Sequence, residues 1–570
     1  METSEHVPAS GFRPASRQRT PSAYRVCDGI TEAALYFMVV FAPWSFGTTE
    51  RWSIWTMNIA GYALGALLLV KWWVGWRASY RPARWESRGS EDGGQTPNPG
   101  SQSRDTRAET PDPRPQTPDP RPQTLDAISQ TPDARNPRRE MPDARSQKTE
   151  AARLLTVALA ALTIAILAFC LISAVNARAS FVTHQMAFVP HDYIAWLPHS
   201  YDRWATWQAF WMYLGLAFTF WSARDWLLGR SARERQEARG EGREPGGGSS
   251  FRASHPVFVI PARLRRLLWV LCLNGALLAL EGILQRLSGT NKLLWLVQPI
   301  INQYAESQFG PYAYRSNAAQ YLNLLWPVCL GFWWTLRQTH ERPGRAGPRV
   351  GGGPHVLLLP CAVLMAAAPI ITTSRGGAIV AAGGMPVALA LLMFTQRKGH
   401  WLMRLGIVFL FAIALGLAGY LGWEKLAPRL KAIFSDDLSG RVEIYRNAEQ
   451  MARDFPAYGT GPGTFPWVYH LYRAHAQAEW AAYAHNDWLE TRITFGRVGF
   501  ALVLAALVVV LLRWFGRGGI RAHWLFVSLI WLALAGCLLH ARFDFPFQIY
   551  STLALFLLLC DVLFCVSRKA

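Results

Sequence analysis

The sequence lacks the cysteine spacings that would indicate a disulfide framework or a zinc site. Of its eight cysteines, Cys27 lies in the N-terminal region and the others lie within apolar runs. No Cys-x-x-Cys pair and no Cys/His ligand pattern occurs. We therefore expect neither a fold held by disulfides nor a structural metal.

Motifs typical of DNA- or RNA-binding proteins are also missing, although the chain is strongly basic. Its formal net charge is +20. The Lys and Arg residues gather in loops beside apolar runs, and not on a helix interleaved with aromatic residues. Such a distribution is the positive-inside pattern of membrane proteins. We expect the partner of this chain to be a lipid bilayer, with no nucleic acid involved.

Apolar residues are abundant, at 51% of the chain. A transmembrane helix needs about twenty consecutive apolar residues, and about twelve runs meet that length. These runs start near Ile30, Trp52, Leu154, Trp207, Leu267, Ala319, Val356, Ala378, Leu405, Val498, Trp524 and Ile549. The predicted fold is an all-α polytopic integral membrane protein of about twelve transmembrane helices with one large helical loop.

Basic residues flank these runs on one side. They precede the first run, follow the second, sixth, eighth and tenth runs, and end the chain, in the groups 13–25, 71–84, 337–349, 397–404, 513–521 and 568–569. With twelve runs, all of these segments fall on the same side, which the positive-inside pattern assigns to the cytoplasm. Both termini are therefore predicted to be cytoplasmic, and the large loop at 424–497 is predicted to face outward.

Composition divides the chain into five regions. Residues 78–150 are rich in Pro, Asp, Arg, Gln and Ser and contain TPDPRPQ twice in tandem. Such a segment cannot bury a core, so we expect a disordered cytoplasmic insertion, with a Pro-rich docking site as the alternative. The other regions are the N-terminal tail with two spans (1–77), a central membrane region with outward loops (151–355), a core containing the large loop (356–515) and the C-terminal spans (516–570).

The large loop and its flanks combine charge, histidines, Gly-Pro turns and helical periodicity. Ser439 is the expected N-cap of an amphipathic helix that Pro456 ends, which places Arg441 in the first turn. The apolar face of this helix comprises Ile444, Ala448, Met451 and Phe455. The start of a helix favours an anion, so a cation there is best explained by an anionic ligand between the two. An ordinary solvated arginine is the alternative.

Two further segments could bind phosphate. Arg375 stands in the polar break TTSRGG between two spans, where a guanidinium can grip phosphate with two hydrogen bonds. The alternative is an arginine that extends to the membrane boundary. The turn AYGTGPGT, with Gly461 and Gly463, signals a phosphate cradle only weakly, because it does not match a P-loop.

The segment AHNDWLE precedes the tenth span and contains His485. A histidine near its usual pKa can take a proton from a hydroxyl, with Asn486 or a carboxylate orienting it; a purely structural histidine is the alternative. We expect Asp487 to support this group. Residues from two other segments could line the same cavity, namely Arg315 and Asn317 in one and His540, Arg542 and Asp544 in the other.

The order of these features resembles the O-antigen ligase and O-antigen polymerase superfamily of bacterial envelope glycosyltransferases. It runs SRGG between two spans, a long outer loop opening with SGR, the turn FPAYGTGPGTF, and AHN before the next span. The specific similarity covers roughly residues 366–499. The stretches FGPYAYRSNAAQY and HARFDFPFQ extend it more weakly across the membrane region.

This resemblance implies transfer of a glycan from an undecaprenyl diphosphate carrier to an acceptor hydroxyl, at the periplasmic face of the bacterial inner membrane. Arg375 and Arg441 would correspond to the arginines that grip the diphosphate, and we add Arg315 to them. His485 would correspond to the histidine that activates the acceptor. No metal and no cofactor is implied. The acceptor, whether lipid, glycan or protein, and the choice between ligase and polymerase stay open.

A secondary transporter of a small anion such as bicarbonate is the alternative function. Transporters commonly show internal repeats and a binding site at the membrane midplane. We find no inverted-repeat similarity, and the polar residues cluster at the outer boundary. A scaffold with Pro-rich docking repeats is a third possibility, but it would leave the outer cluster unexplained.

Overall fold

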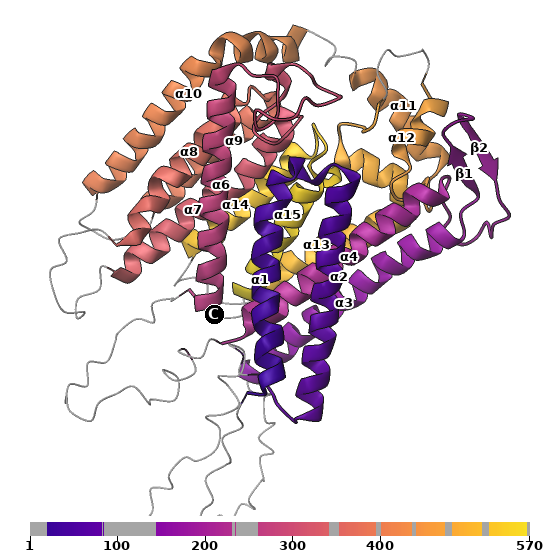
Figure 1. The fold of residues 1–570 in the computed structure, drawn as a ribbon, viewed down its shortest axis with the longest axis horizontal. Coiled ribbons are helices and arrows are strands. Elements are labelled where there is room, and N and C mark those ends of the chain that lie inside the picture. Colours follow the sequence, from indigo (N-terminus) through magenta and orange to yellow (C-terminus); the bar gives the residue numbers. More distant parts are fainter. Residues whose placement is uncertain are drawn as a thin grey trace, which may run out of the picture.

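The computed structural model describes residues 20–82, 84, 144–230, 234, 260–340, 353–394, 401–435, 441–473, 481–515 and 524–566. These residues are mostly helical, and the long helices stand side by side as a bundle (Figure 1). The bundle comprises α1 (Ser22–Trp44), α2 (Arg51–Arg77), α3 (Ala144–Val175), α4 (Arg203–Leu228), α6 (Ala262–Ser288), α7 (Arg315–His340), α8 (Leu358–Ile371), α9 (Arg375–Met393), α10 (Trp401–Ser435), α13 (Asp487–Phe515), α14 (Trp524–His540) and α15 (Tyr550–Val566). The predicted disordered insertion falls largely outside the described residues, although α3 begins within its last part.

The predicted apolar runs correspond to these helices. Val356 and Ile549 lie directly before α8 and α15, and the other predicted starts lie within a helix. Among the described residues, eight helices are long and apolar enough to cross a membrane, and α14 and α15 are shorter apolar helices. The helices α4 and α7 are not among these ten, because they are long enough but less apolar. Nearly every residue of α7 is buried, because it packs between α8 and α14, which is how its polar side chains avoid lipid.

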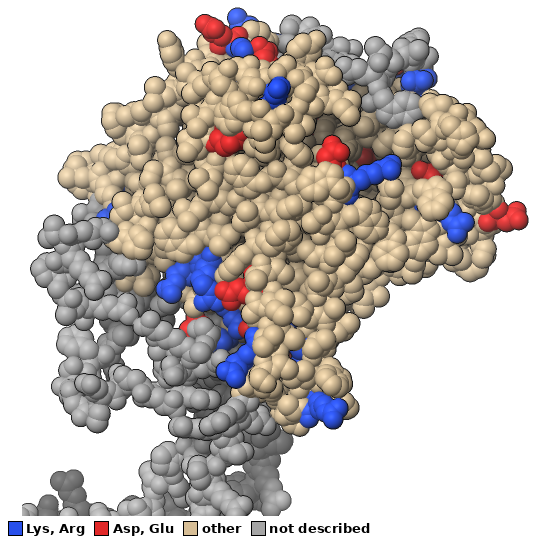
Figure 2. Space-filling view, in the orientation of Figure 1, with Lys and Arg blue, Asp and Glu red and all other residues tan. Residues whose placement is uncertain are grey.

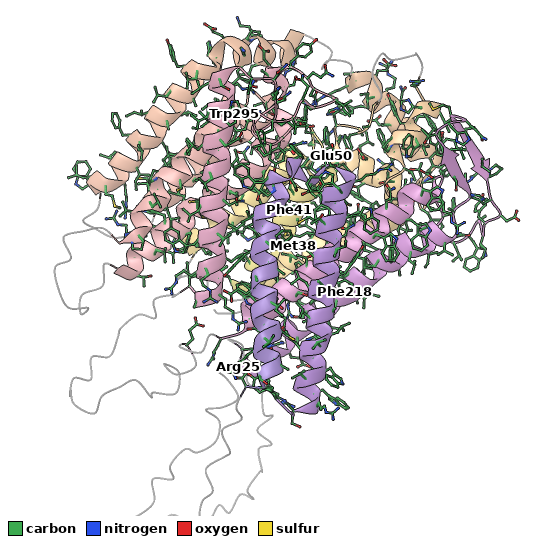
Figure 3. All side chains as sticks on the ribbon, in the orientation of Figure 1. Arg25, Met38, Phe41, Glu50, Phe218 and Trp295 are labelled. Atoms are coloured by element: carbon green, nitrogen blue, oxygen red, sulfur yellow. The ribbon has the colours of Figure 1, made fainter. Side chains whose placement is uncertain are left out.

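Small residues bring neighbouring helices close together. A Cβ at Gly65 of α2 would lie 2.5 Å from the Phe218 ring of α4, so these two helices pack backbone against side chain. Figure 3 shows Phe218 there, with Met38 buried in α1 and with Arg25 and Glu50 at the two ends of the α1–α2 pair.

One end of the bundle is held by buried ion pairs. Lys71 Nζ lies 2.9 Å from Asp28 Oδ1 and 2.7 Å from Asp225 Oδ2, and Asp28 also pairs with Arg263. These contacts join the start of α1 and α6 to the end of α2 and α4. We predicted that Lys71 follows the second span, but it lies inside α2 and is only 2% exposed, because the two carboxylates compensate its burial. Figure 2 shows Lys and Arg side chains gathered with a few Asp and Glu side chains on the surface in the lower half of the view.

A small hairpin departs from the all-α prediction. Strand β1 (Ala179–Val182) pairs antiparallel with β2 (Ala187–Pro190), with Ala179 opposite Pro190. Aromatic and β-branched residues favour strands. Here Phe181 packs on Phe188, with ring centroids 5.1 Å apart, and stacks on Trp467, with centroids 4.7 Å apart.

The outer loop contains two further helices, α11 (Arg441–Asp454) and α12 (Phe465–Val468). The predicted apolar face of α11 is confirmed, since Ala448 and Met451 are fully buried and Ile444 and Phe455 pack beside them. Their neighbours in this small second core include Phe465 and Ile493 of α12 and α13. The loop is therefore anchored on the start of α13.

Candidate active site

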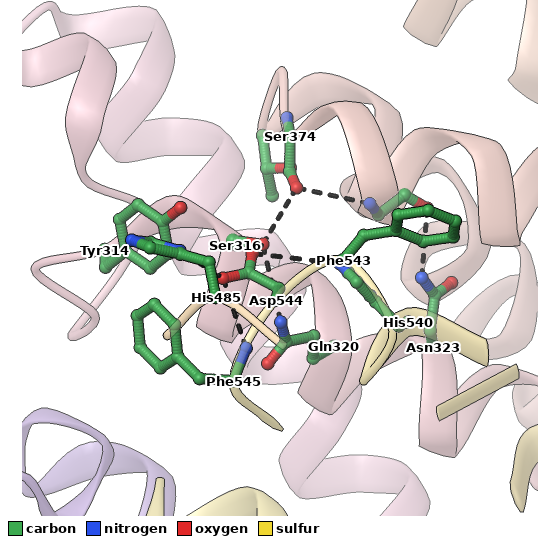
Figure 4. A network of polar contacts seen from close by, with 12 residues as sticks. Tyr314, Ser316, Gln320, Asn323, Ser374, His485, His540, Phe543, Asp544 and Phe545 are labelled. Carbon is green, nitrogen blue, oxygen red and sulfur yellow. Dashed lines mark hydrogen bonds and ion pairs between the residues drawn. The ribbon is translucent and has the colours of Figure 1, made fainter. Parts of the chain in front are cut away.

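Four segments that are distant in the sequence meet at the end of the bundle opposite the buried ion pairs. They are the start of α7, the start of α9, the residues before α13, and the connection between α14 and α15 (Figure 4). Together they hold His485, Asp544, Ser316 and Ser374 in one hydrogen-bonded chain.

His485 and Asp544 form the centre of this chain. His485 Nδ1 lies 3.1 Å from Asp544 Oδ1, and the imidazole is 26% exposed whereas the carboxylate is 6% exposed. Burial acts to raise the pKa of Asp544, but the hydrogen bond and charge of His485 and the charge of Arg441 lower it to about 2. An ionised carboxylate only accepts hydrogen bonds, so it assigns the proton to Nδ1 and leaves Nε2 with a lone pair.

Two serines connect Asp544 to α9. Ser316 Oγ donates to Asp544 Oδ2 at 2.5 Å, and Ser374 Oγ donates to Ser316 Oγ at 3.0 Å. Ser374 is the N-cap of α9 and accepts from the Gly377 N–H at 3.2 Å. Arg375, half-buried, is the first residue of that helix. The chain therefore fixes the helix end that carries Arg375 relative to His485.

The backbone at His485 is strained. Its φ is +51°, in the left-handed region that residues other than glycine seldom adopt. The flanking groups hold it there: the Tyr445 hydroxyl donates to the His485 carbonyl at 2.9 Å, and Glu490 Oε2 accepts from the Ala484 N–H at 2.8 Å. The imidazole also packs edge-on against Phe545. Such strain persists only where surrounding contacts impose it, as they do here.

Arg441 lies beside this centre. Its Nη1 donates to the Phe543 carbonyl at 2.7 Å, and its Nη2 lies 3.5 Å from the Tyr314 hydroxyl. Burial acts to lower the pKa of Arg441, but Asp544 and Tyr314 raise it overall. A guanidinium has five N–H groups, so these contacts leave donors for an anionic ligand.

The other predicted residues have mainly structural contacts. Arg315 Nη1 donates to the Glu306 carbonyl at 2.6 Å, and Asn317 is buried in the first turn of α7. Asn486 Oδ1 caps α13 by accepting from the Leu489 N–H at 3.2 Å. The Asp487 carboxylate does not orient His485 directly; it accepts from the Phe547 N–H at 2.7 Å and from Gln548 Nε2 at 3.0 Å. Asp487 thus ties α13 to the connection that carries Asp544.

The glycine-rich turn packs into a break in α13. At Gly496, φ is 61° and ψ is −170°, a conformation open mainly to glycine. Four backbone hydrogen bonds join the turn to the break: Thr460 N–H to Ile493 O (2.8 Å), Gly461 N–H to Thr494 O (3.0 Å), Arg497 N–H to Pro456 O (2.9 Å) and Val498 N–H to Ala457 O (3.1 Å). They replace the two helical bonds, from 497 to 493 and from 498 to 494, that an unbroken α13 would form.

The same turn contacts the start of α4 through Gly461 and Gly463. Their φ values are +105° and +79°, and a Cβ at Gly461 would lie 2.4 Å from Ser200 Oγ. A Cβ at Gly463 would lie 3.0 Å from the Ala205 carbonyl oxygen. Close backbone packing therefore accounts for both glycines.

A cavity of about 600 Å³ opens beside the centre. It is lined by Tyr445, Glu449, Arg453, Asn486, Trp488, Leu489, Arg492, Phe500 and Arg542. A second, mostly apolar cavity of about 290 Å³ lies among α3, α4, α13 and α15. Trp488 and Phe500 line both, so a polar space and an apolar space meet at these two rings.

Sequence reasoning did not identify several residues of the centre. It named Asp544 as a cavity residue but not as the partner of His485, and it did not single out Ser316, Ser374 or Tyr445 as site residues. Short polar residues beside apolar runs have no pattern that pairs them, since the contacts cross up to 228 positions of sequence. Among the described residues, no group of three or more His, Cys, Asp or Glu side chains is arranged to hold a metal ion.

Comparison with known families finds a match, which covers part of the candidate site. Residues 360–504 match the family model described as O-antigen ligase. The match includes Arg375, Arg441 and His485, whereas Ser316 and Asp544 lie outside it. No curated protein is similar enough to the chain to be matched with it. The apolar helices and the family match together indicate a bacterial membrane protein of the glycosyl-transfer type. Over residues 360–504 the chain is similar to O-antigen ligases, which supports the expected resemblance to the O-antigen ligase and O-antigen polymerase superfamily.

Proposed function

We propose that this protein is an inner-membrane glycosyltransferase that moves a glycan from an undecaprenyl diphosphate carrier to an acceptor hydroxyl. The family match supports glycosyl transfer with lipid-linked glycans. The observation that carries the proposal is the 3.1 Å contact between His485 Nδ1 and the ionised Asp544. It leaves Nε2 of a partly exposed imidazole as a base at the edge of a cavity.

His485 acts as the general base. The acceptor oxygen attacks the sugar carbon that is bonded to the diphosphate, and its proton passes to His485 Nε2. Asp544 stabilises the imidazolium that forms and holds the ring in the required tautomer. The new carbon–oxygen bond forms as the carbon–oxygen bond to the diphosphate breaks, and the electron pair leaves with the lipid diphosphate.

Arg441, Arg375 and Arg315 bind the diphosphate and offset the charge that develops on it. Arg441 is next to the Asp544–His485 pair, and Arg375 begins the helix that Ser374 links to the same pair. Guanidinium groups can form two parallel hydrogen bonds to phosphate. Preorganised positive charge at the leaving group stabilises the transition state. We expect transfer to proceed in EDTA, because these arginines supply that charge.

The site faces the periplasm in this proposal. The start of α1 and the ends of α2 and α4 meet in the buried ion pairs, and Arg224 of α4 lies over the Phe564 ring near the end of α15. The active-site segments occupy the opposite end of the bundle. With the basic loops in the cytoplasm, both termini are cytoplasmic and His485 is periplasmic. The family match lends no support to transport of a small anion.

The test is transfer by the purified protein in nanodiscs, with undecaprenyl diphosphate-linked glycan and a panel of lipid, glycan and protein acceptors, with and without EDTA. We expect His485→Ala, Asp544→Asn and Arg441→Ala to lose most transfer while Arg446→Ala, an exposed change on α11, retains it. Full transfer by His485→Ala would show that His485 is not the general base. No transfer by the unaltered protein to any acceptor, together with anion uptake into proteoliposomes, would favour the transporter.

A further inference from the structure

We propose that the cavity lined by Arg453, Arg492 and Arg542 is a binding subsite for a negatively charged sugar, one that carries a carboxylate or a phosphate. This inference rests on the proposed function, since it assumes that the substrate of the neighbouring centre is a glycan.

The cavity adjoins the active centre through Tyr445 and Asn486, although His485, Asp544 and Arg441 themselves do not line it. Three segments beside the centre also supply an arginine to the cavity, whereas the starts of α7 and α9, which carry Ser316 and Ser374, do not. Helix α11 supplies Arg441 and Arg453. The segment that leads into α13 and its first turns supply His485 and Arg492, and the α14–α15 connection supplies Asp544 and Arg542. A molecule that reacts at His485 and extends away from it can therefore enter this cavity.

Helix α11 runs from the active centre to the cavity. Arg441, Tyr445, Glu449 and Arg453 recur every four residues, so they follow one ridge of the helix. Tyr445 belongs to both places, because its hydroxyl donates to the His485 carbonyl and its side chain lines the cavity. From Arg441 to Arg453 the helix rises roughly 18 Å, which suits a short oligosaccharide better than a single sugar.

The charge of the cavity selects an anion. Three guanidinium groups face it with one carboxylate, that of Glu449. No hydrogen bond or ion pair joins the guanidinium groups of Arg453, Arg492 or Arg542 to another of the described residues, and all three side chains are exposed. Three positive charges with one negative charge leave a net positive cavity, which raises the local concentration of anions.

The remaining lining suits a sugar. Asn486, Glu449 and Tyr445 supply hydrogen-bonding groups for hydroxyls, and Trp488 supplies an aromatic face for the apolar side of a sugar ring. An inorganic anion would leave these groups unused. The lining as a whole therefore indicates an acidic saccharide, either of the donor chain or of the acceptor.

Binding can be tested without transfer. The full-length protein in nanodiscs would be titrated by calorimetry with a tetragalacturonate and with its neutral methyl ester, at low and high salt, in an inactive His485→Ala background. We expect preference for the charged probe, and a loss of about tenfold in its affinity in Arg492→Ala and in Arg542→Ala, because each removes a charge-assisted hydrogen bond. Arg446→Ala removes the same charge from α11 outside the cavity and should leave the affinity unchanged.

Equal binding of the charged and neutral probes, or an equal loss in Arg446→Ala, would overturn the subsite. Transfer assays then identify the source of the anionic sugar. With a charged donor and a neutral acceptor, and with the reverse pair, Arg492→Ala should raise KM only for the substrate that carries the charge. If the unaltered protein transfers glycan but shows no charge preference, the subsite fails and the proposed function stands. If the unaltered protein binds the charged probe but transfers no glycan, the subsite stands and the proposed function fails.

Discussion

The centre around His485 and the adjoining arginine cavity use charge in opposite ways. At the centre, Asp544 is buried and bonded to His485 and Ser316, and Ser374 extends the chain to α9. In the cavity, three exposed arginines have no such partners among the described residues. In the proposed function, the first arrangement is preorganised for one chemical step, whereas the second binds a charged chain. Changes at the centre should therefore affect kcat, and changes in the cavity should affect KM.

The largest effect is expected from His485→Ala. Removing a general base typically slows a reaction by about 10²–10⁴-fold, and we expect kcat to fall by that amount with little change in KM. Single-turnover transfer in nanodiscs measures it, with size-exclusion chromatography to establish that the variant folds. If His485→Ala raised KM and left kcat unchanged, the distinction between the centre and the cavity would be lost.

Asp544→Asn should slow transfer by about 10²-fold or more. The amide retains the size of the carboxylate, but it loses the charge that stabilises the imidazolium. It can also donate to Nδ1, which would leave the ring proton on Nε2. The pH–rate profile separates this effect from simple misfolding, because the acid limb that reports His485 should shift while the protein remains folded. An unchanged profile would rule out Asp544 as the group that positions His485.

Stability at low pH should depend on Asp544. Its pKa is about 2 in the folded protein and 3.8 as an ordinary value. A depressed carboxylate pKa stabilises the fold above the ordinary value, and this contribution of about 2 kcal/mol is lost as pH falls from about 4 to about 2. Thermal unfolding in detergent across that range should show the difference between the unaltered protein and Asp544→Asn shrinking with acidity. A constant difference would contradict this account.

The smallest effect is expected from Arg453→Ala, the cavity arginine farthest along α11 from Arg441. We expect KM for an acidic glycan to rise only a few-fold, with kcat and the KM for a neutral glycan unchanged, since Arg453 lies farthest from the reacting end of the bound chain. Raising the salt concentration should raise the KM of the unaltered protein for the acidic glycan to that of the variant. A loss of kcat would mean that the cavity and the centre are not separate.

The positions of the spans were predictable, because burial in lipid demands long apolar runs that the sequence displays openly. The apolar face of α11 was predictable for a similar reason, since helical periodicity is local. The hairpin β1–β2 and the position of Lys71 inside α2 were not. Both depend on partners elsewhere in the chain: Trp467 for the hairpin, and Asp28 and Asp225 for Lys71.

By itself the sequence determined a polytopic helical membrane protein and the motifs that contain Arg375, Arg441 and His485. Each of these features depends on composition, periodicity or residues close together in the chain. Only the tertiary structure decided that Asp544 is the partner of His485, that the glycine-rich turn fills the break at Gly496, and that three arginines from separate elements share one cavity. Those pairings join backbone and side-chain groups many turns of helix apart, and no local pattern specifies which of them will meet when the helices pack.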